Sequence, residues 1–385
     1  SLGHGRGISV TVRSGEVETV EHNRDKSLSV TVYFGHRSGN ASTTDFSREA
    51  VISCVEAAQR IAKYTEEDPY NGLADPARLA REIPDLDLFH PWDVSMEEAV
   101  DIARRCEHAA LSTDERIKNT EGGSLSSHHG ADLYANSDDF RGLTRSSRHS
   151  ISCSVIAGEG SEMQRDYWYD SRCDRRLLAA AEEVGRETAR RTLRRLGARK
   201  ASTRSCPVVF EAPVASSLLS HLTTAISGSS LYRKSSFLTD SLGKQLFPTS
   251  IRIHEQPLLR GGAGSASFDN EGVATMARDI VTEGVLQSYL LGSYSARKLG
   301  METTGHAGGV HNLTIEPTIE GGLEELLGQM GQGLLVTELI GFGINNVTGD
   351  YSRGAFGFLV ENGKIASPVQ ELTIAGNLRD LSLIH

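Results

Sequence analysis

The residue with the clearest chemical potential in this chain is His221, which lies in an amphipathic helical segment, residues 218–226. A zinc peptidase helix needs a glutamate beside its first histidine, to activate the metal-bound water, and a second histidine about one turn away. Here the neighbouring residue is Leu222, and position 226 is Ile226. A single histidine cannot hold zinc, because a tetrahedral site takes three or four ligands. The sequence therefore predicts neither a metal site nor a general base on this segment.

A glycine-rich loop at residues 303–312 carries two further histidines, His306 and His311. Glycine lets another backbone approach closely, so the loop fits either a tight turn between strands or the wall of a peptide-binding groove. No acidic residue or cysteine lies at a spacing that would complete a metal site with this pair. Three histidines of the first half of the chain are interpreted as surface residues: His128, His129 and His149.

The densest polar segment of the chain is residues 348–358, in which Asp350 and Arg353 could pair across a turn. Ser352 lies in the same segment but has no histidine and aspartate context that would make it a nucleophile. We interpret the segment first as a turn and second as a groove lining. The candidate substrate-binding residues are then His306, His311, Asp350, Tyr351 and Arg353.

Length and composition bound the class of protein. The chain has 385 residues, which suggests two domains, because single cores rarely grow past roughly 250–300 residues. The formal net charge of −10 argues against nucleic acid as a partner, since binding to phosphates needs a basic face. Five cysteines without a CxxC pair are typical of a reducing compartment, so we expect a cytoplasmic protein. No stretch approaches the length of about 18 apolar residues that a membrane span requires.

The first 197 residues are predicted to form an α+β domain. Residues 7–44 alternate apolar and polar side chains between glycine turns, which indicates antiparallel strands. Helices are predicted at 47–64, from Ser95 onward, and at 177–196, and strands return at 116–170. The expected architecture is two layers, an antiparallel sheet with helices on one face.

Residues 198–385 are predicted to form a β-rich C-terminal domain with a few helices. A short buried strand at 207–210 leads into the helix that carries His221, and that helix is expected to stop at Gly228. The strongest hairpin signal is the pair Asn362-Gly363 between two apolar runs.

Several polar and glycine-containing motifs together resemble the TldD/PmbA family, in its PmbA branch, which is also called TldE. The resemblance covers nearly the whole chain. In the first domain it rests on Phe89-His90-Pro91 and Asn119-Thr120-Glu121-Gly122-Gly123. In the rest of the chain it rests on Leu231-Tyr232-Arg233-Lys234-Ser235-Ser236-Phe237, Ser241-Leu242-Gly243-Lys244-Gln245, Ser293-Tyr294-Ser295-Ala296-Arg297-Lys298-Leu299-Gly300, Gly305-His306-Ala307-Gly308-Gly309 and Thr348-Gly349-Asp350-Tyr351-Ser352-Arg353-Gly354.

The resemblance implies a particular division of labour. In this family a TldD-type subunit carries an HExxxH helix and binds catalytic zinc, and a PmbA-type subunit of similar fold pairs with it in a cytosolic peptidase. When this chain is aligned by its helix, His221 takes the place of the first histidine, but Leu222 replaces the glutamate and Ile226 the second histidine. A further TldD-type ligand is a late cysteine, and this sequence has none after Cys206.

The resemblance therefore implies a non-catalytic subunit without its own metal cofactor, whose partner supplies the zinc. It also implies a heterodimer with a TldD-type protein, a homodimer in isolation, and short or unfolded peptides and peptide precursors as substrates. An N-terminal helical segment and a C-terminal stretch are expected beyond the residues given. Two alternatives stay open: a self-sufficient metallopeptidase with other ligands, and a non-enzymatic modulator that binds another protein such as DNA gyrase.

Overall fold

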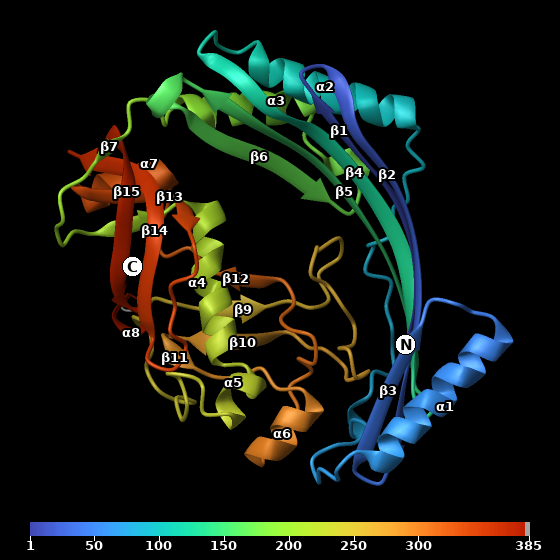
Figure 1. Cartoon of the computed structure of the whole chain (residues 1–385). Helices are drawn as coiled ribbons and strands as arrows, with labels where there is room; N and C mark the ends of the chain where they lie inside the picture. Colours follow the sequence, from blue (N-terminus) through green and yellow to red (C-terminus); the bar gives the residue numbers. More distant parts are fainter. Residues whose placement is uncertain (382–385) are drawn as a thin grey trace. The chain divides into compact units, whose positions relative to one another are not determined.

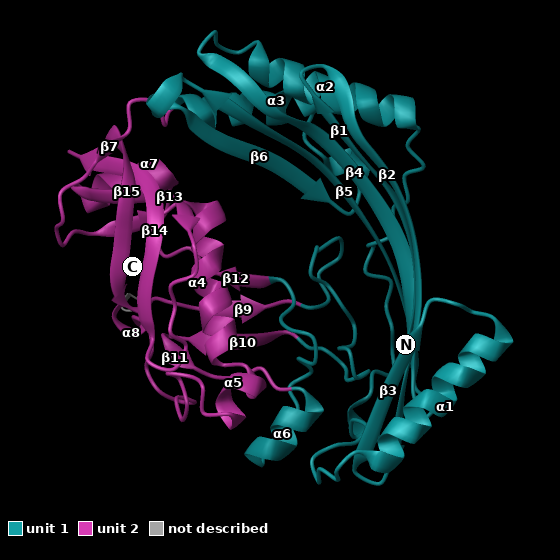
Figure 2. Ribbon diagram, viewed as in Figure 1, with its two compact units in different colours: residues 1–193, 257–276, 292–312 teal, residues 194–256, 277–291, 313–385 magenta. Residues whose placement is uncertain are grey.

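The computed structural model describes residues 1–381 of the chain. The described chain divides into two compact units (Figure 2). Unit 1 comprises residues 1–193, 257–276 and 292–312, and unit 2 comprises residues 194–256, 277–291 and 313–385. The long segment of unit 1 ends four residues before the boundary that the sequence suggested after residue 197. Each unit is also built from segments that are far apart in the sequence.

Unit 1 is built on a six-stranded antiparallel sheet with the strand order β3-β2-β1-β4-β5-β6 (Figure 1). The meander that the alternating sequence predicted at 7–44 is confirmed. Ser14 and Gly15 form the turn between its first two strands, and both residues have positive φ. The strands are β1 (Leu2–Arg13), β2 (Glu16–Phe34), β3 (Arg37–Thr43), β4 (Ile117–Ala135), β5 (Arg141–Ala157) and β6 (Gln164–Arg172).

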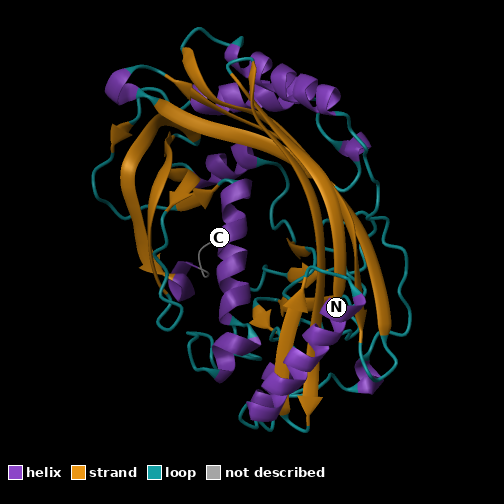
Figure 3. Cartoon of the chain, turned by 45° about the vertical axis from the view of Figure 1, so that its right-hand side comes forward, coloured by secondary structure: helices purple, strands orange, loops and turns teal. Residues whose placement is uncertain are grey.

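Three helices cover one face of this sheet, so the predicted two-layer α+β arrangement is confirmed (Figures 1 and 3). They are α1 (Arg48–Tyr64), α2 (Met96–Leu111) and α3 (Ala181–Leu193). The first two begin where their capping serines predict, since Ser47 Oγ accepts from the amide of Ala50 and Ser95 Oγ from that of Glu98. The third is shorter than the predicted 177–196, and a separate 3-10 turn at Arg175–Leu177, capped by Asp174, precedes it. A fourth helix of unit 1, α6, spans Ser293–Leu299.

Glycine permits the closest contact between two of these helices. A Cβ added at Gly185 of α3 would overlap the carbonyl oxygen of Cys106 in α2. Replacing Gly185 by alanine is therefore expected to lower the free energy of unfolding by about 1–3 kcal/mol, as overpacking does. Chemical denaturation with the fluorescence of the two tryptophans as the signal measures this change.

A matched control is Gly328→Ala in α7 (Leu323–Met330), where an added Cβ would meet nothing within 4 Å. Alanine is favoured over glycine in a helix, so this variant is expected to gain roughly 0.5–1 kcal/mol. Equal effects at the two positions would contradict the close packing of α2 on α3.

Unit 2 contains two small sheets, and the prediction of a β-rich part with few helices is confirmed. The first has the order β11-β10-β9-β12 and the second the order β7-β15-β14-β13-β8. The Asn362-Gly363 hairpin joins β14 to β15, with positive φ at both turn residues, as a type I′ turn requires. The strands are β7 (Arg199–Lys200), β8 (Val208–Phe210), β9 (Ile253–Glu255), β10 (Arg278–Thr282), β11 (Val285–Leu286), β12 (Leu313–Ile315), β13 (Gly333–Ile340), β14 (Asp350–Glu361) and β15 (Lys364–Asn377).

The remaining helices of unit 2 are α4 (Ala212–Ala225), α5 (Gly228–Tyr232), α7 and α8 (Leu378–Leu381). The predicted strand at 207–210 is confirmed as β8, which pairs in parallel with β13 and leads directly into α4. Leu327 of α7 packs with Phe356 and Phe358 of β14 in a buried cluster. Among the described residues, no helix is both long enough and apolar enough to cross a membrane.

Candidate functional site

Helix α4 carries His221, and the two positions that matter for a metal are part of the hydrophobic core. Leu222 is 7% exposed and Ile226 is fully buried. Within residues 1–381 no three His, Cys, Asp or Glu side chains come together in a way that could hold a metal ion. The residues around His221 therefore do not fit the zinc site that the helix position suggests, because the side chains that would have to coordinate the ion are buried hydrocarbon.

His221 has two polar neighbours on β14, and no carboxylate among the described residues pairs with it. Its ring lies 6.1 Å from the ring of Tyr351, edge to face, and Tyr351 is 1% exposed. Burial lowers the pKa of His221, and the nearby guanidinium of Arg353 lowers it further. His221 is therefore a neutral imidazole at neutral pH. Without an acid to polarise it, the ring can offer or accept a hydrogen bond but is not set up as a general base.

Three buried polar atoms of this cluster have no hydrogen-bond partner among the described residues: His221 Nε2, Tyr351 Oη and Arg353 Nε. Burial raises the pKa of Tyr351, and the charge of Arg353 opposes that rise. The guanidinium of Arg353 is thus close to the hydroxyl of Tyr351. Unpaired polar groups in a core are costly, so such a cluster is a candidate for binding rather than for structural support.

His221 also lines a cavity of about 530 Å³ that lies entirely within unit 2. Most of its wall is aliphatic or aromatic. Two cations, Lys244 and Arg379, belong to the lining, and no aspartate or glutamate does, as far as the described chain extends. The apolar wall consists of Leu218, Leu219, Leu222, Phe237, Leu238, Leu246, Phe247, Pro248, Ile251, Ile253, Ile315 and Leu378.

The five residues predicted to line a peptide groove fall into both units. His306 and His311 belong to unit 1, where their ring centroids are 6.2 Å apart. His306 is 7% exposed, and its Nδ1 lies 2.9 Å from Thr304 Oγ1.

Asp350, Tyr351 and Arg353 lie at the start of β14 in unit 2. The segment is a strand here, so the interpretation of Asp350 and Arg353 as a pair across a turn is wrong. Residues three apart on a strand point to opposite faces. The carboxylate of Asp350 instead accepts from Thr348 Oγ1 at 2.6 Å and from Asn377 Nδ2 at 3.1 Å, and these bonds lower its pKa.

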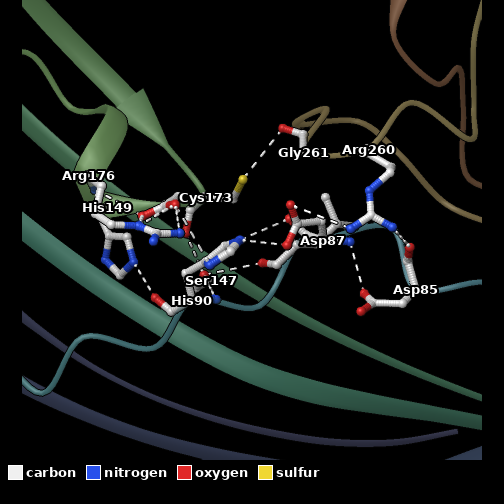
Figure 4. A network of polar contacts seen from close by, with 11 residues as sticks. Asp85, Asp87, His90, Ser147, His149, Cys173, Arg176, Arg260 and Gly261 are labelled. Carbon is white, nitrogen blue, oxygen red and sulfur yellow. Dashed lines mark hydrogen bonds and ion pairs between the residues drawn. The ribbon is translucent and has the colours of Figure 1, made fainter.

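His149 of β5 was expected at the surface, and that prediction is wrong. The side chain is fully buried. Its Nε2 donates to the carbonyl of His90 at 2.9 Å, and its Nδ1 lies 2.9 Å from Ser127 Oγ (Figure 4 shows the first of these bonds). Burial lowers the pKa of His149, which favours the neutral ring with its proton on Nε2. Buried residues alternate along β5, and His149 lies on the same face of the strand as the buried Ile151 and Cys153. The sequence prediction missed this because histidine is a polar residue.

The same region holds a polar network that sequence reasoning missed (Figure 4). His90 Nε2 lies 3.2 Å from an oxygen of Asp87, and its Nδ1 lies 3.8 Å from Asp174. Arg176 binds Asp174 through two nitrogens and, with the amide of the same residue, lowers the pKa of that carboxyl to about 2. The guanidinium of Arg260 lies 3.8 Å from Asp87. Only the motif Phe89-His90-Pro91 pointed to this place.

Ser147 and Cys173 link this network to its surroundings. Ser147 Oγ accepts from the amide of His90 at 2.8 Å and lies 2.6 Å from the carbonyl of Cys173. Cys173 Sγ lies 3.4 Å from the carbonyl oxygen of Gly261 (Figure 4). The network thus ties the loop before α2 and the segment that begins at residue 257 to strand β5. Asp174 pairs with Arg176 and Asp87 with Arg260, so these carboxylates have partners of opposite charge and we assign the network a structural role.

The buried state of His149 predicts how stability depends on pH. The pKa of His149 is lower in the folded chain than in the unfolded chain, so below about pH 6.5 the unfolded state binds a proton that the folded state does not. The free energy of unfolding should therefore fall as the pH drops from 7 to 5, by up to about 1.4 kcal/mol per pH unit for each such histidine. His129 and His221 have lowered pKa values as well and act in the same direction.

Denaturant titrations at several pH values measure this slope. The variant His149→Gln keeps a donor for the His90 carbonyl but does not titrate, so its slope between pH 7 and 5 should be shallower than that of the unaltered chain. Equal slopes would show that His149 does not stay neutral in the folded state.

Comparison with known proteins adds family information to this geometry. Models of the PmbA/TldA metallopeptidase family match almost the whole chain: domain 1 matches residues 1–62, the central domain matches 89–196, and the C-terminal domain matches 203–382. The metalloprotease PmbA of Escherichia coli O157:H7 is 53% identical over 377 residues, which cover 97% of this chain and 83% of that protein. The PmbA homologue of Haemophilus influenzae is 50% identical over 375 residues, with the same coverage.

Solved structures resemble the whole chain. A Bacteroides thetaiotaomicron protein described as a candidate modulator of DNA gyrase superimposes with a TM-score of 0.93 at 31% identity, over 99% of this chain and 86% of that one. TldE of Thermococcus kodakarensis superimposes with a TM-score of 0.85 at 21% identity, over 99% of this chain and 88% of that one, which shows a shared fold.

Proposed function

Since the chain belongs to the PmbA/TldD metallopeptidase family, we propose that it is the PmbA-type, non-catalytic subunit of a peptidase complex with a TldD-type partner. The observation that carries the proposal is the burial of Leu222 and Ile226 at the place of the family's metal-binding helix. Both side chains are hydrocarbons that pack in the core of unit 2, so no change of rotamer could supply a metal ligand or a general base at these two positions.

In the proposed complex the zinc belongs to the partner, and it supplies the activated water for hydrolysis of the peptide bond. This chain contributes half of an enclosed reaction chamber and part of the surface that holds the peptide. An extended peptide is bound by pairing with an exposed strand edge, which recognises the backbone rather than the sequence. Folded proteins offer no free strand, which accounts for a preference for short or unfolded substrates.

The sheets of this chain offer such edges. The six-stranded sheet ends at β3 and β6, and the five-stranded sheet ends at β7 and β8. His306 and His311 on one unit, and Asp350, Tyr351 and Arg353 on the other, remain our candidates for peptide contacts. The net charge of −10 makes nucleic acid a poor partner. We place the complex in the cytoplasm, in keeping with five cysteines that all lack a disulfide, and we expect homodimers when the partner is missing.

The test is purification of the chain alone and together with a TldD-type protein from the same cell, followed by metal analysis and digestion of an unstructured peptide. We expect the chain alone to carry far less than one zinc per molecule and to leave the peptide intact. The pair should co-purify, bind zinc and cleave. Stoichiometric zinc and cleavage by the chain alone would favour a self-sufficient metallopeptidase instead.

A second candidate function is non-enzymatic modulation of another protein, which is favoured by the description of the Bacteroides relative as a candidate gyrase modulator. The same preparations decide between the two. A change in supercoiling by purified gyrase on addition of the isolated chain, without any proteolysis, would support modulation over a role in peptide cleavage.

A further inference from the structure

The cavity beside His221 has the size and character of a ligand site. Its volume of about 530 Å³ lies inside the usual range of roughly 300–1,000 Å³ for small-molecule pockets, which are mostly apolar with a few well-placed polar groups. It forms where α4 meets strands β9 and β12 and the segment 237–251, all within unit 2. Leu219 of α4, Ile253 of β9 and Ile315 of β12 contribute to its apolar wall.

The charge around this cavity is one-sided. Acidic residues outnumber basic ones in the whole chain, 50 to 40, yet none belongs to the described lining, which includes Lys244 and Arg379. Lys244 is exposed, and its ammonium forms no ion pair within residues 1–381. Arg379 holds its guanidinium near the ring of Phe237, at 5.9 Å. A ligand with one negative charge is therefore attracted by the two cations of the described lining.

The uncharged polar groups of the lining present oxygen atoms. Thr239 Oγ1 donates to the carbonyl of Ser236 at 2.9 Å, and the side-chain nitrogen of Gln245 donates to backbone carbonyls. Their donor hydrogens are used in this way, so what remains for a ligand is lone pairs that accept from an N–H. His221 Nε2 adds a buried atom without a protein partner in the described chain. A ligand that suits this lining has an apolar group, an N–H and an anion.

We propose that this pocket binds the C-terminal residue of a peptide, with a large aliphatic or aromatic side chain in the cavity and the free α-carboxylate near Lys244. The assignment rests on the proposed function for its substrate class. A peptide end supplies all three features at once, whereas a fatty acid supplies the anion and the apolar chain but no N–H. The site would let a subunit without a metal hold one end of the substrate.

The proposal predicts a clear pattern of affinities for the isolated chain, measured by calorimetry. A blocked tetrapeptide ending in leucine with a free carboxyl should bind at one site. Its C-terminal amide, and the same peptide ending in alanine, should each bind at least about tenfold more weakly, which corresponds to about 1.4 kcal/mol. Decanoate should compete poorly. Equal affinity for acid and amide, tighter binding of decanoate, or no saturable binding would each overturn the proposal.

Variants locate the site. Lys244→Gln removes the rim charge and should weaken the leucine peptide about tenfold, while Ile315→Trp, at a side chain that is 45% exposed, should fill the cavity and abolish binding without unfolding the chain. Lys364→Gln, at an exposed hairpin position of the same unit, is the matched control and should bind like the unaltered chain. Far-ultraviolet circular dichroism and Tm confirm that each variant is folded.

These binding measurements need neither zinc nor a partner, so their failure is separate from failure of the proposed function. If the chain co-purifies with a TldD-type protein but does not bind peptides through their carboxylate, the proposed function stands and the proposal for this pocket is wrong. If the chain binds the leucine peptide but activates no partner, the proposal for this pocket stands and the proposed function is wrong.

Discussion

Installing the family's missing residues, Leu222→Glu together with Ile226→His, is expected to unfold unit 2 rather than to create a metal site. The two side chains are 7% and 0% exposed, so the double variant places an acid and an imidazole in hydrocarbon. The desolvation of a buried charge costs several kcal/mol, and a changed shape in a packed core adds about 1–3 kcal/mol. We expect the free energy of unfolding to fall by at least about 4 kcal/mol. Denaturant titration measures it, and metal analysis shows whether zinc is bound.

The same two residue types on the exposed side of the same helix provide the control. Ser220→His together with Thr224→Glu changes positions that are both exposed in α4. Surface substitutions of this kind usually shift stability by less than about 0.5 kcal/mol each. If the buried double variant stays as stable as this control and takes up one zinc per chain, the argument from burial fails, and the helix is a metal site that has merely lost two ligands.

The second large effect is expected at the ion pair between Arg191 of α3 and Asp166 of β6. Both side chains are nearly buried, at 6% and 7% exposure, and Arg191 Nε lies 3.5 Å from Asp166 Oδ2. The guanidinium also lies over the ring of Trp168 at 4.8 Å. Arg191→Met would leave a buried carboxylate without its cation, which costs about 3–5 kcal/mol. The loss should appear as a lower free energy of unfolding in denaturant.

Its neighbour on the same helix gives a matched comparison. Arg190 pairs with Glu187 at 2.6 Å, but its side chain is 60% exposed, and exposed pairs contribute about 0–1 kcal/mol. Arg190→Met should therefore have a small effect. The double variant Arg191→Met with Asp166→Leu removes both buried charges and should recover much of the loss. Similar losses for Arg190→Met and Arg191→Met would contradict the buried pair.

The parts of the fold that depend on neighbouring residues could be predicted from the sequence. Ser47 and Ser95 cap their helices because capping needs only a hydroxyl and an amide three residues later. Asn362 and Gly363 turn a hairpin because both tolerate positive φ. The expectation that α4 carries too few metal ligands also needs only the spacing along one helix, and the structure adds that Leu222 and Ile226 are buried.

Contacts between distant residues could not be predicted in this way. The environment of His149 depends on the carbonyl of His90, which is 59 residues earlier in the sequence. The cavity beside His221 collects side chains from residues 218 to 379, and nothing in the local pattern of Lys244 or Ile315 marks them as neighbours. The strand that contains Asp350 was interpreted as a turn, because its glycines and polar residues are typical of turns and its pairing with β15 is not a local property.

The way the chain is threaded has a consequence for any attempt to divide the protein. The polypeptide passes between the two units five times, after residues 193, 256, 276, 291 and 312. Phe268 and Val273, from one returning segment, pack in a buried cluster with Phe140 and Leu79. A fragment cut after residue 197 would lack two of the six buried members of that cluster and expose the rest to water. A split gene or a premature stop codon near this boundary would therefore produce fragments in which the core of unit 1 is incomplete.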